Sequence, residues 1–390
     1  MIQAYAAFEP HGRLEPFAYD PGPLKPDEVE IDVLSCGICH SDLSIIDSEW
    51  GRTRYPVVAG HEVVGTIART GTHAGRLAVG QMVGLGWHAG YCDDCPSCRS
   101  GDHNLCAAAQ PTIVGHHGGF ADKVRAAANS VVPLPPGVDP ESAGPLFCGG
   151  ITVFNPLVQF GVSPTDRVAV IGIGGLGHLA LRFLRAWGCE ATAFTSSEAK
   201  REEALALGAR HTLDSRDPAA LKAAAGRFDL VMSTVNVKLD WNLYLETLKP
   251  RGRLHFLGAT LDPLDIGLFS LLGAQRSISA SPVGSPATIA RMLDFAARHQ
   301  IRPVIETFRF DAVNDALDRC AAARPITAWC SAVDNLIMGQ VYFFAMAREA
   351  TLRRLRWKDL EGRRAAQVTG LLGEHVDALL ATLSKPIRKP

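Results

Sequence analysis

The sequence predicts an α/β protein in which an irregular β-domain is followed by a doubly wound domain with a parallel sheet. The first 150 or so residues are rich in Gly and Pro and carry short β-branched runs between turn residues, such as "VEIDVL" at 29–34 and "EVVGTI" at 62–67. That pattern is typical of a β-domain with many short strands. From about residue 165, the apolar run "RVAVIGIG" is followed by "LGHLALRFLRAW", which has helical periodicity, and by a second strand, "EATAFTS". A strand, a helix and a strand in this order form a βαβ unit, whose strands are parallel.

The same alternation continues along the chain. "FDLVMSTV" predicts a buried strand, "WNLYLETL" a helix and "GRLHFLGA" the next strand, so a doubly wound domain over 150–282 accounts for the pattern. After it, "ATIARMLDFAARHQ" predicts an amphipathic helix, and "FDAVNDALDRC" begins as another.

Composition and charge narrow the class of protein. The chain has 390 residues, of which 47% are hydrophobic and 20% charged, so we expect a soluble protein with two or three domains. Lys and Arg number 39 against 40 Asp and Glu, which gives no excess charge to attract nucleic acid or an anionic membrane surface. No segment approaches the roughly 18 apolar residues of a membrane span, and the N-terminus lacks the pattern of a secretion signal. We therefore expect a cytoplasmic protein without nucleic-acid or membrane partners.

A glycine-rich loop directly follows the first strand of the doubly wound domain. Residues 172–177, "GIGGLG", fit the pattern G-x-G-x-x-G and open a helix. The glycines allow a tight turn and a close approach of the backbone to a pyrophosphate, which then lies at the helix N-terminus. A merely structural turn is the alternative, but this context favours a Rossmann dinucleotide site. The residues predicted to bind the cofactor here are Gly172, Gly174, Gly175, Leu176 and Gly177.

The end of the second strand indicates which dinucleotide binds. An acidic residue there would bind the ribose 2′-hydroxyl of NAD, whereas this chain reads "AFTSSEAKR" over 193–201. Hydroxyls and cations can bind a 2′-phosphate, so NADP(H) is the predicted cofactor, although Glu198 leaves NAD open. A solvated helix start is the alternative role for the two cations. The residues predicted to bind the phosphate end are Thr195, Ser196, Ser197 and Lys200.

Cysteines point to two metal sites. Four thiols lie within fifteen residues, at Cys92, Cys95, Cys98 and Cys106, and this spacing suits a closed, structural zinc site. A redox centre is the alternative. A zinc ribbon that binds nucleic acid would need an excess of positive charge, which this chain lacks. A catalytic zinc needs three protein ligands and one exchangeable position. The candidates, each of which could also be a packed core residue, are Cys39, His61 and Cys148.

These motifs together resemble the zinc-dependent alcohol dehydrogenases of the medium-chain dehydrogenase/reductase superfamily, in particular their NADP-dependent cinnamyl alcohol dehydrogenase and aldehyde reductase branch. "CGICHSD", "RYPVVAGHEVVG", the four-cysteine segment, "GGFAD", "GPLFCGGITVFNPL", "GIGGLGHLA" and "KREEALALGA" occur in the family's order over residues 1 to about 319. The resemblance implies a discontinuous GroES-like β-barrel catalytic domain, 1–149 and 283–330, around the Rossmann domain. It also implies a homodimer formed through edge strands of the cofactor domains.

The resemblance assigns roles to individual residues. It makes Cys39, His61 and Cys148 the catalytic zinc ligands, with Glu62 as a possible transient ligand. Asp42 would orient His61, as carboxylates behind metal-binding histidines do. It makes Ser41 the proton donor on the substrate side and places His40 near the cofactor pyrophosphate, with an ordinary loop position as the alternative for each. It also places three aromatic residues in the substrate pocket, each with a core position as its alternative: Trp50, Trp87 and Phe147.

The implied reaction is reversible hydride transfer between NADP(H) and an alcohol/aldehyde pair, with zinc as the Lewis acid. Many relatives carry a proton-relay histidine three residues after the Ser41 position, but this chain has Ser44. Because serine does not titrate near neutrality, we predict a weaker or shifted pH dependence. An NAD-dependent polyol dehydrogenase and a catalytically impaired cofactor-binding or regulatory protein remain alternatives.

The resemblance stops after Arg319, where "CAAARPITAWC" replaces the expected final turn and strand. Restoring one nucleotide behind the Arg319 codon allows codons that read "LRGGKAHYRVV", which is close to the expected ending. Our hypothesis is therefore a single-base deletion that shifts the frame from residue 320. A genuine extension or a poorly packed tail are the alternatives for the atypical tail 331–390. In each case "ITAWCSAV" must replace the last strand of the catalytic domain, or that strand is lost.

Overall fold

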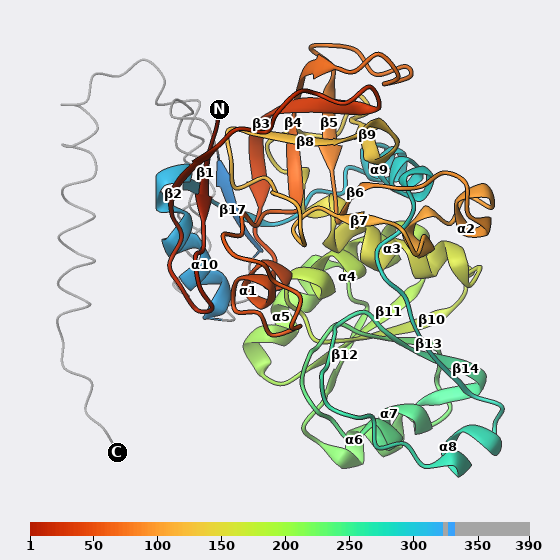
Figure 1. Ribbon diagram of the computed structural model, residues 1–390. Helices are drawn as coiled ribbons and strands as arrows, with labels where there is room; N and C mark the ends of the chain where they lie inside the picture. The colour runs from red at the N-terminus through yellow and green to blue at the C-terminus, as the bar shows by residue number, and fades with distance from the viewer. Residues whose placement is uncertain (323–326, 332–390) are drawn as a thin grey trace, which may run out of the picture. The chain divides into compact units, whose positions relative to one another are not determined.

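The computed structural model describes residues 1–322 and 327–331, which lie within one compact unit (Figure 1). The predictions for the tail 331–390 therefore lie outside the described residues, except at residue 331. The boundaries at 149/150 and 282/283 stay predictions. No helix among the described residues is long and apolar enough to cross a membrane.

The N-terminal strands and the last two described strands form a curled sheet of seven strands. Its order is β16-β17-β3-β4-β5-β9, with β8 paired to β3. All its pairings are antiparallel except that of β16 with β17. The alternation in "VEIDVL" explains the core strand, because Val29, Ile31 and Val33 point into the hydrophobic core. The strands are β3 (Glu28–Gly37), β4 (Glu62–Thr70), β5 (Met82–Leu85), β8 (Lys123–Ala127), β9 (Val131–Pro133), β16 (Ile305–Arg309) and β17 (Thr327–Ser331).

Shorter elements surround this sheet. The hairpin of β1 (Ile2–Ala6) and β2 (Glu15–Tyr19) is antiparallel, as is the small pair β6 (His88–Gly90) and β7 (Gln110–Pro111). Two short helices carry residues of interest, α1 (His40–Ile46) and α2 (Pro96–Arg99).

The predicted doubly wound domain is confirmed as a parallel sheet of six strands in the order β12-β11-β10-β13-β14-β15 (Figure 1). The strand order reverses at β10, and the crevice beyond the carboxyl ends of the strands at such a point is where dinucleotides bind. The strands are β10 (Arg167–Ile171), β11 (Glu190–Thr195), β12 (His211–Asp214), β13 (Phe228–Ser233), β14 (Leu248–Phe256) and β15 (Ser277–Ala280).

Both faces of this sheet are packed against hydrophobic residues, which explains why its strands are continuous apolar runs in the sequence. On β10, Val168 and Val170 join one hydrophobic cluster, whereas Ala169 and Ile171 join another that includes Trp241. The helices are α3 (Gly149–Gln159), α4 (Gly175–Trp187), α5 (Glu198–Leu207), α6 (Pro218–Ala223), α7 (Trp241–Glu246), α8 (Leu268–Leu272) and α9 (Pro286–His299).

The last described elements return to the seven-stranded sheet. The predicted helix after residue 310 is α10 (Val313–Ala321), which buries Val313, Ala316 and Leu317. Part of "ITAWCSAV" forms β17, parallel to β16 and antiparallel to β3. This segment therefore occupies a strand position next to the core strand, so that position is not lost.

Candidate active site

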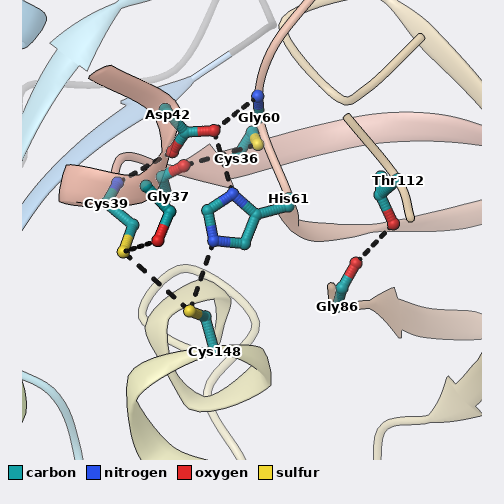
Figure 2. Close-up of polar contacts among 10 residues, drawn as sticks. Cys36, Gly37, Cys39, Asp42, Gly60, His61, Gly86, Thr112 and Cys148 are labelled. Atoms are coloured by element: carbon teal, nitrogen blue, oxygen red, sulfur yellow. Dashed lines mark hydrogen bonds and ion pairs between the residues drawn. The ribbon is translucent and has the colours of Figure 1, made fainter. Parts of the chain in front are cut away.

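The first site is built where β3 passes into α1. The backbone N–H of Cys39, the residue before the helix, donates to Asp42 Oδ2 at 2.9 Å. Asp42 lies in the first turn of α1, where a carboxylate is favoured by the helix N-terminus. Its other oxygen, Oδ1, accepts from Gly60 N at 2.8 Å and lies 2.9 Å from His61 Nδ1 (Figure 2). A single buried carboxylate thus joins the two loops that carry Cys39 and His61.

His61 is fully buried and its orientation is fixed by Asp42. Because the carboxylate is an acceptor, Nδ1 carries a hydrogen and Nε2 is directed at Cys148, whose Sγ is 3.2 Å away. Cys148 Sγ lies 3.9 Å from Cys39 Sγ. The ligand atoms of Cys39, His61, Glu62 and Cys148 all lie within 4.8 Å of one another. The structure therefore brings the three predicted ligands together, with the nitrogen and sulfur donors that zinc prefers.

The pKa shifts of Cys39 and His61 also favour the binding of a metal cation. The hydrogen bond from Cys148 holds the pKa of Cys39 well below its ordinary value, which favours a thiolate, although burial opposes it. Burial works against a charged His61 as well, yet the Asp42 carboxylate keeps the pKa of the imidazole well above its ordinary value. A basic imidazole beside a thiolate is a good metal-binding pair.

The Glu62 carboxylate lies beside these predicted ligands. Its side chain is buried, and Oε2 has no hydrogen-bond partner among the described residues. Burial raises the pKa of Glu62 well above its ordinary value, and the charge of Cys39 raises it further. A side chain at Gly37 would collide with this carboxylate, so the glycine leaves room for it. The geometry is compatible with the predicted role as a transient ligand.

The four-cysteine segment forms a second cluster around α2. The sulfurs of Cys92, Cys95, Cys98 and Cys106 lie within 4.8 Å of one another. Backbone N–H groups point at them: Cys95 N lies 3.4 Å from Cys92 Sγ, and Cys98 N lies 3.5 Å from Cys95 Sγ. Hydrogen bonds from the backbone at Asp94 and Cys95 lower the pKa of Cys92 to about 6. Four converging thiols with such support fit a closed tetrahedral zinc site.

The two serines of α1 have different surroundings. Ser41 Oγ lies 3.7 Å from Cys39 Sγ, next to the metal-binding cluster. Ser44 is buried, and its hydroxyl donates to Glu49 Oε2 at 2.6 Å. Sequence reasoning missed this contact, although Glu49 lies only five residues along the chain.

Two of the three predicted pocket residues lie close to the cluster. The Trp87 ring stands edge-on to His61, with the ring centres 5.1 Å apart, and Trp50 packs on Trp87 at 5.9 Å. Phe147 is different, because it is fully buried in the hydrophobic core and its ring packs against Gly84. The missing side chain at Gly84 thus gives the ring a core position next to Cys148, which is the alternative role expected for Phe147, and its place in the substrate pocket stays a prediction.

The glycine loop has the predicted form. Gly172 has a φ of 85°, which favours glycine, and a side chain at Gly177 would collide with the Gly172 carbonyl. Gly174 precedes α4, so Gly175 and Leu176 present N–H groups at the helix N-terminus. Thr234, which sequence reasoning missed, donates its hydroxyl hydrogen towards the carbonyls of Ile171 and Gly172, at 2.9 and 2.7 Å. These features fit a pyrophosphate.

The end of β11 carries the groups predicted to bind the 2′-phosphate. Thr195 Oγ1 is buried and has no partner within the part of the chain that the structure describes. Ser197 Oγ accepts from Lys200 N at 3.4 Å, which leaves its hydrogen available to a ligand. Ser196 and Lys200 are partly exposed beside it. Glu198, the acid that left NAD open, binds Arg201 at 2.9 Å.

One polar contact joins the two halves of the site. His40 Nε2 lies 3.4 Å from Asn236 Nδ2, which belongs to the loop after β13. His40 thus lies between the metal-binding loop and the cofactor half of the molecule, as expected for a residue near the pyrophosphate. Asn236 carried no motif, so its part could not be found from the sequence.

A doubly wound dinucleotide fold beside a Cys–His–Cys cluster defines a zinc-binding, nucleotide-dependent oxidoreductase. Comparison with family models agrees: residues 25–136 match the alcohol dehydrogenase GroES-like domain, and residues 175–298 match the zinc-binding dehydrogenase domain. The chain is 64% identical over 317 residues to an aldehyde reductase of Synechocystis, covering 81% of this chain and 94% of that one. It is 37% identical to cinnamyl alcohol dehydrogenase 7 of Arabidopsis thaliana, over 82% of this chain and 92% of the relative. The chain therefore belongs to the zinc-dependent alcohol dehydrogenases of the medium-chain dehydrogenase/reductase superfamily.

Solved structures agree with this assignment. A cinnamyl alcohol dehydrogenase of Sorghum bicolor superposes with a TM-score of 0.81 at 35% identity, covering 85% of this chain and 97% of that one. A cinnamyl alcohol dehydrogenase of Helicobacter pylori, solved in complex with NADP(H), gives a TM-score of 0.78 at 27% identity with the same coverage. The predicted combination of a GroES-like and a Rossmann domain is confirmed.

Proposed function

We propose that this alcohol dehydrogenase is an NADPH-dependent aldehyde reductase that holds a catalytic and a structural zinc ion. The observation that carries the proposal is the buried cluster of Cys39, His61 and Cys148, with Asp42 fixing the imidazole. The relatives named as aldehyde reductase and cinnamyl alcohol dehydrogenase support it. Zinc in that cluster supplies a Lewis acid for the carbonyl oxygen, and bound NADPH supplies the hydride.

The residues of the chain then have separate tasks. Ser41, beside Cys39, would pass a proton to the substrate oxygen as the alcohol forms, and its hydroxyl would regain that proton from solvent through the nicotinamide ribose hydroxyl. Asp42 keeps Nδ1 of His61 protonated, so that Nε2 can bind the metal. His40 contributes its ring at the cofactor side, next to Asn236. Trp50 and Trp87 offer aromatic surface near the cluster, which favours aromatic or medium-length aliphatic aldehydes.

The choice of NADPH rests on the end of β11. The Ser197 hydroxyl and the Lys200 ammonium can both donate to a 2′-phosphate, and Ser196 and Thr195 add hydroxyls beside them. Glu198 is held by Arg201, so its charge is compensated and the strand end offers no free acid to the ribose. The solved relative that binds NADP(H) supports the same choice.

We also propose a homodimer. The strand β15 lies at the edge of the six-stranded sheet, and an apolar surface lies close to it in sequence, with Phe269 88% exposed. An open strand edge beside exposed apolar side chains suits pairing with a second copy across a two-fold axis. The apolar surface is formed by Leu261, Leu264, Leu268, Phe269 and Leu272.

A cytoplasmic location agrees with the cysteine chemistry. The nine cysteines within residues 1–322 are all free of disulfides. The cytoplasm keeps thiols reduced, which leaves them available as zinc ligands.

Cofactor kinetics test this proposal. Initial rates of benzaldehyde reduction should give a higher kcat/KM for NADPH than for NADH. Lys200→Ala should lower kcat/KM for NADPH about tenfold or more, because a charge-assisted hydrogen bond to phosphate is lost, and should leave the NADH value unchanged. Lys222→Ala, on α6, is the matched control. A wild type that prefers NADH, or an equal loss with both cofactors, would overturn the NADPH assignment.

A further inference from the structure

His178 lies one turn into α4, directly after the glycine loop, and has no task in the proposed reaction. Its side chain is buried, with only 3% of its surface exposed. Both ring nitrogens nevertheless have partners, and the partners belong to two segments that lie far apart in the sequence.

The first partner is the loop that receives the pyrophosphate. The carbonyl of Gly174 accepts the backbone N–H of His178 at 2.9 Å and lies 3.2 Å from Nδ1. Since a carbonyl only accepts, Nδ1 carries the hydrogen. In a planar trans peptide the C=O and the N–H point in opposite directions. Holding the Gly174 carbonyl against the helix therefore aims the N–H of Gly175 outward, where a phosphate binds at a helix N-terminus.

The second partner is the segment that returns to the catalytic half. The backbone N–H of Val304 donates to Nε2 of His178 at 3.1 Å, and β16 of the seven-stranded sheet begins at the next residue. One turn further along α4, Arg182 donates to the carbonyl of Arg302 at 2.5 Å. Two side chains on the same face of α4 thus hold the returning segment.

Both contacts need a neutral ring with its hydrogen on Nδ1. Burial lowers the pKa of His178 to about 4, so the ring is neutral at physiological pH. A protonated Nε2 would lose the bond from Val304.

We propose that His178 is a positioning residue for the cofactor, which fixes the Gly174–Gly175 peptide for the pyrophosphate and ties this loop to the segment leading back to the catalytic sheet. The inference rests on the proposed binding of NADPH. It goes beyond that proposal because it assigns a role to a residue that touches neither the substrate nor the metal-binding cluster.

His255 provides a matched control. It is also fully buried in the cofactor half, its nitrogens lie 2.9 and 3.0 Å from the hydroxyls of Ser279 and Ser281, and burial lowers its pKa to about 4. It belongs to β14, near the sheet edge, and not to the glycine loop. His255→Leu should lower the Tm as His178→Leu does, without weakening NADPH binding.

Three substitutions separate the two contacts of His178. The amide nitrogen of His178→Asn takes the place of Nδ1 and can still donate to Gly174, whereas the amide of His178→Gln lies near Nε2 and keeps only the bond with Val304. Titration of NADPH fluorescence should give a Kd within about twofold of wild type for H178N, and a Kd about tenfold higher for H178Q and H178L. Equal binding by H178L and wild type, or an equal loss in H255L, would overturn the proposal.

The tautomer of His178 gives a test that needs no bound cofactor. In ¹⁵N NMR of the wild type, the ring assigned by its absence in H178N should show a protonated Nδ1 and an unprotonated Nε2. A ring with the hydrogen on Nε2 would contradict both contacts. If wild type binds no NADPH while this tautomer is observed, the proposed function fails and the loop geometry stands.

Discussion

Asp42 accepts hydrogen bonds from the backbone N–H groups of Cys39 and Gly60 and from Nδ1 of His61. Asp42→Asn retains the shape of the side chain but loses its charge. The NH₂ group of the amide can then face one of these N–H groups, where no hydrogen bond can form. We expect the affinity of the catalytic site for zinc to fall about 10- to 100-fold, as for other carboxylates behind metal-binding histidines. Competition with a zinc chelator measures this loss.

Asp47→Asn is the control for this experiment. Asp47 ends the same helix, and its carboxylate lies 3.2 Å from the exposed His11. It should leave the zinc affinity unchanged. If Asp42→Asn binds zinc as tightly as Asp47→Asn, Asp42 does not support His61 in metal binding.

Ser44 sits where a titrating histidine was expected from the family pattern, and its hydroxyl is bound to Glu49. Ser44→His introduces a group with an ordinary pKa of about 6.5. The rate of aldehyde reduction should then depend more steeply on pH between about 6 and 8. Ser44→Ala controls for the loss of the Glu49 contact. Superimposable pH profiles of Ser44→His and wild type would remove position 44 from the proton path.

A local motif was enough to group the four cysteines of the second cluster, whereas the Cys39–His61–Cys148 cluster and side-chain directions were harder to predict. Cys39, His61 and Cys148 come from three loops, and only the family pattern joined them before the fold was known. The choice between a pocket and a core role for Phe147 could not be made from the sequence, because a position next to a predicted ligand does not determine which way a ring points. Its direction depends on the space over Gly84, some sixty residues earlier in the chain.

At the scale of elements, the four-cysteine segment around α2 is proposed to hold its loop through zinc, without taking part in the reaction. Cys106→Ser should lower the zinc content by about one ion per chain and the Tm by about 5–10 °C, since metal binding contributes to folding. Activity measured well below the Tm should persist. Atomic emission and calorimetry give the two quantities.

Cys189→Ser serves for comparison, because Cys189 lies outside both clusters and its Sγ lies 3.3 Å from the carbonyl of Ser163. It should retain all the zinc. Complete loss of activity in folded Cys106→Ser at low temperature would contradict a purely structural site.

The elements themselves were largely predictable from periodicity. The apolar strand, glycine loop and helix of the first βαβ unit appear at β10 and α4 as expected. The hydrogen bonds that tie elements together were not predictable. His178 and Val304, for example, are bonded although they lie 126 residues apart, and no sequence pattern links them. Pairing of β17 with β3 likewise depends on tertiary contacts.

At the scale of the whole molecule, the exposed apolar surface around α8 and the edge strand β15 predict a dimer. Phe269→Asp places a charge on the most exposed side chain of this surface in both copies and should weaken dimerisation about 100-fold or more. Sedimentation velocity over a concentration series would show it. Leu205→Asp, on α5 and also exposed, should leave the dimer intact. A monomeric wild type, or a dimer unaffected by Phe269→Asp, would rule out this interface.

The central claim is that the buried cysteine–histidine cluster supports NADPH-dependent reduction of aldehydes. The most direct measurement combines the zinc content of the purified protein with NADPH oxidation over a panel of aromatic and aliphatic aldehydes. We predict two zinc ions per chain, one for each cluster, and oxidation that stops on chelation and returns when zinc is added. Two zinc ions per chain without NADPH oxidation by any aldehyde would contradict the account and indicate a cofactor-binding protein without this activity.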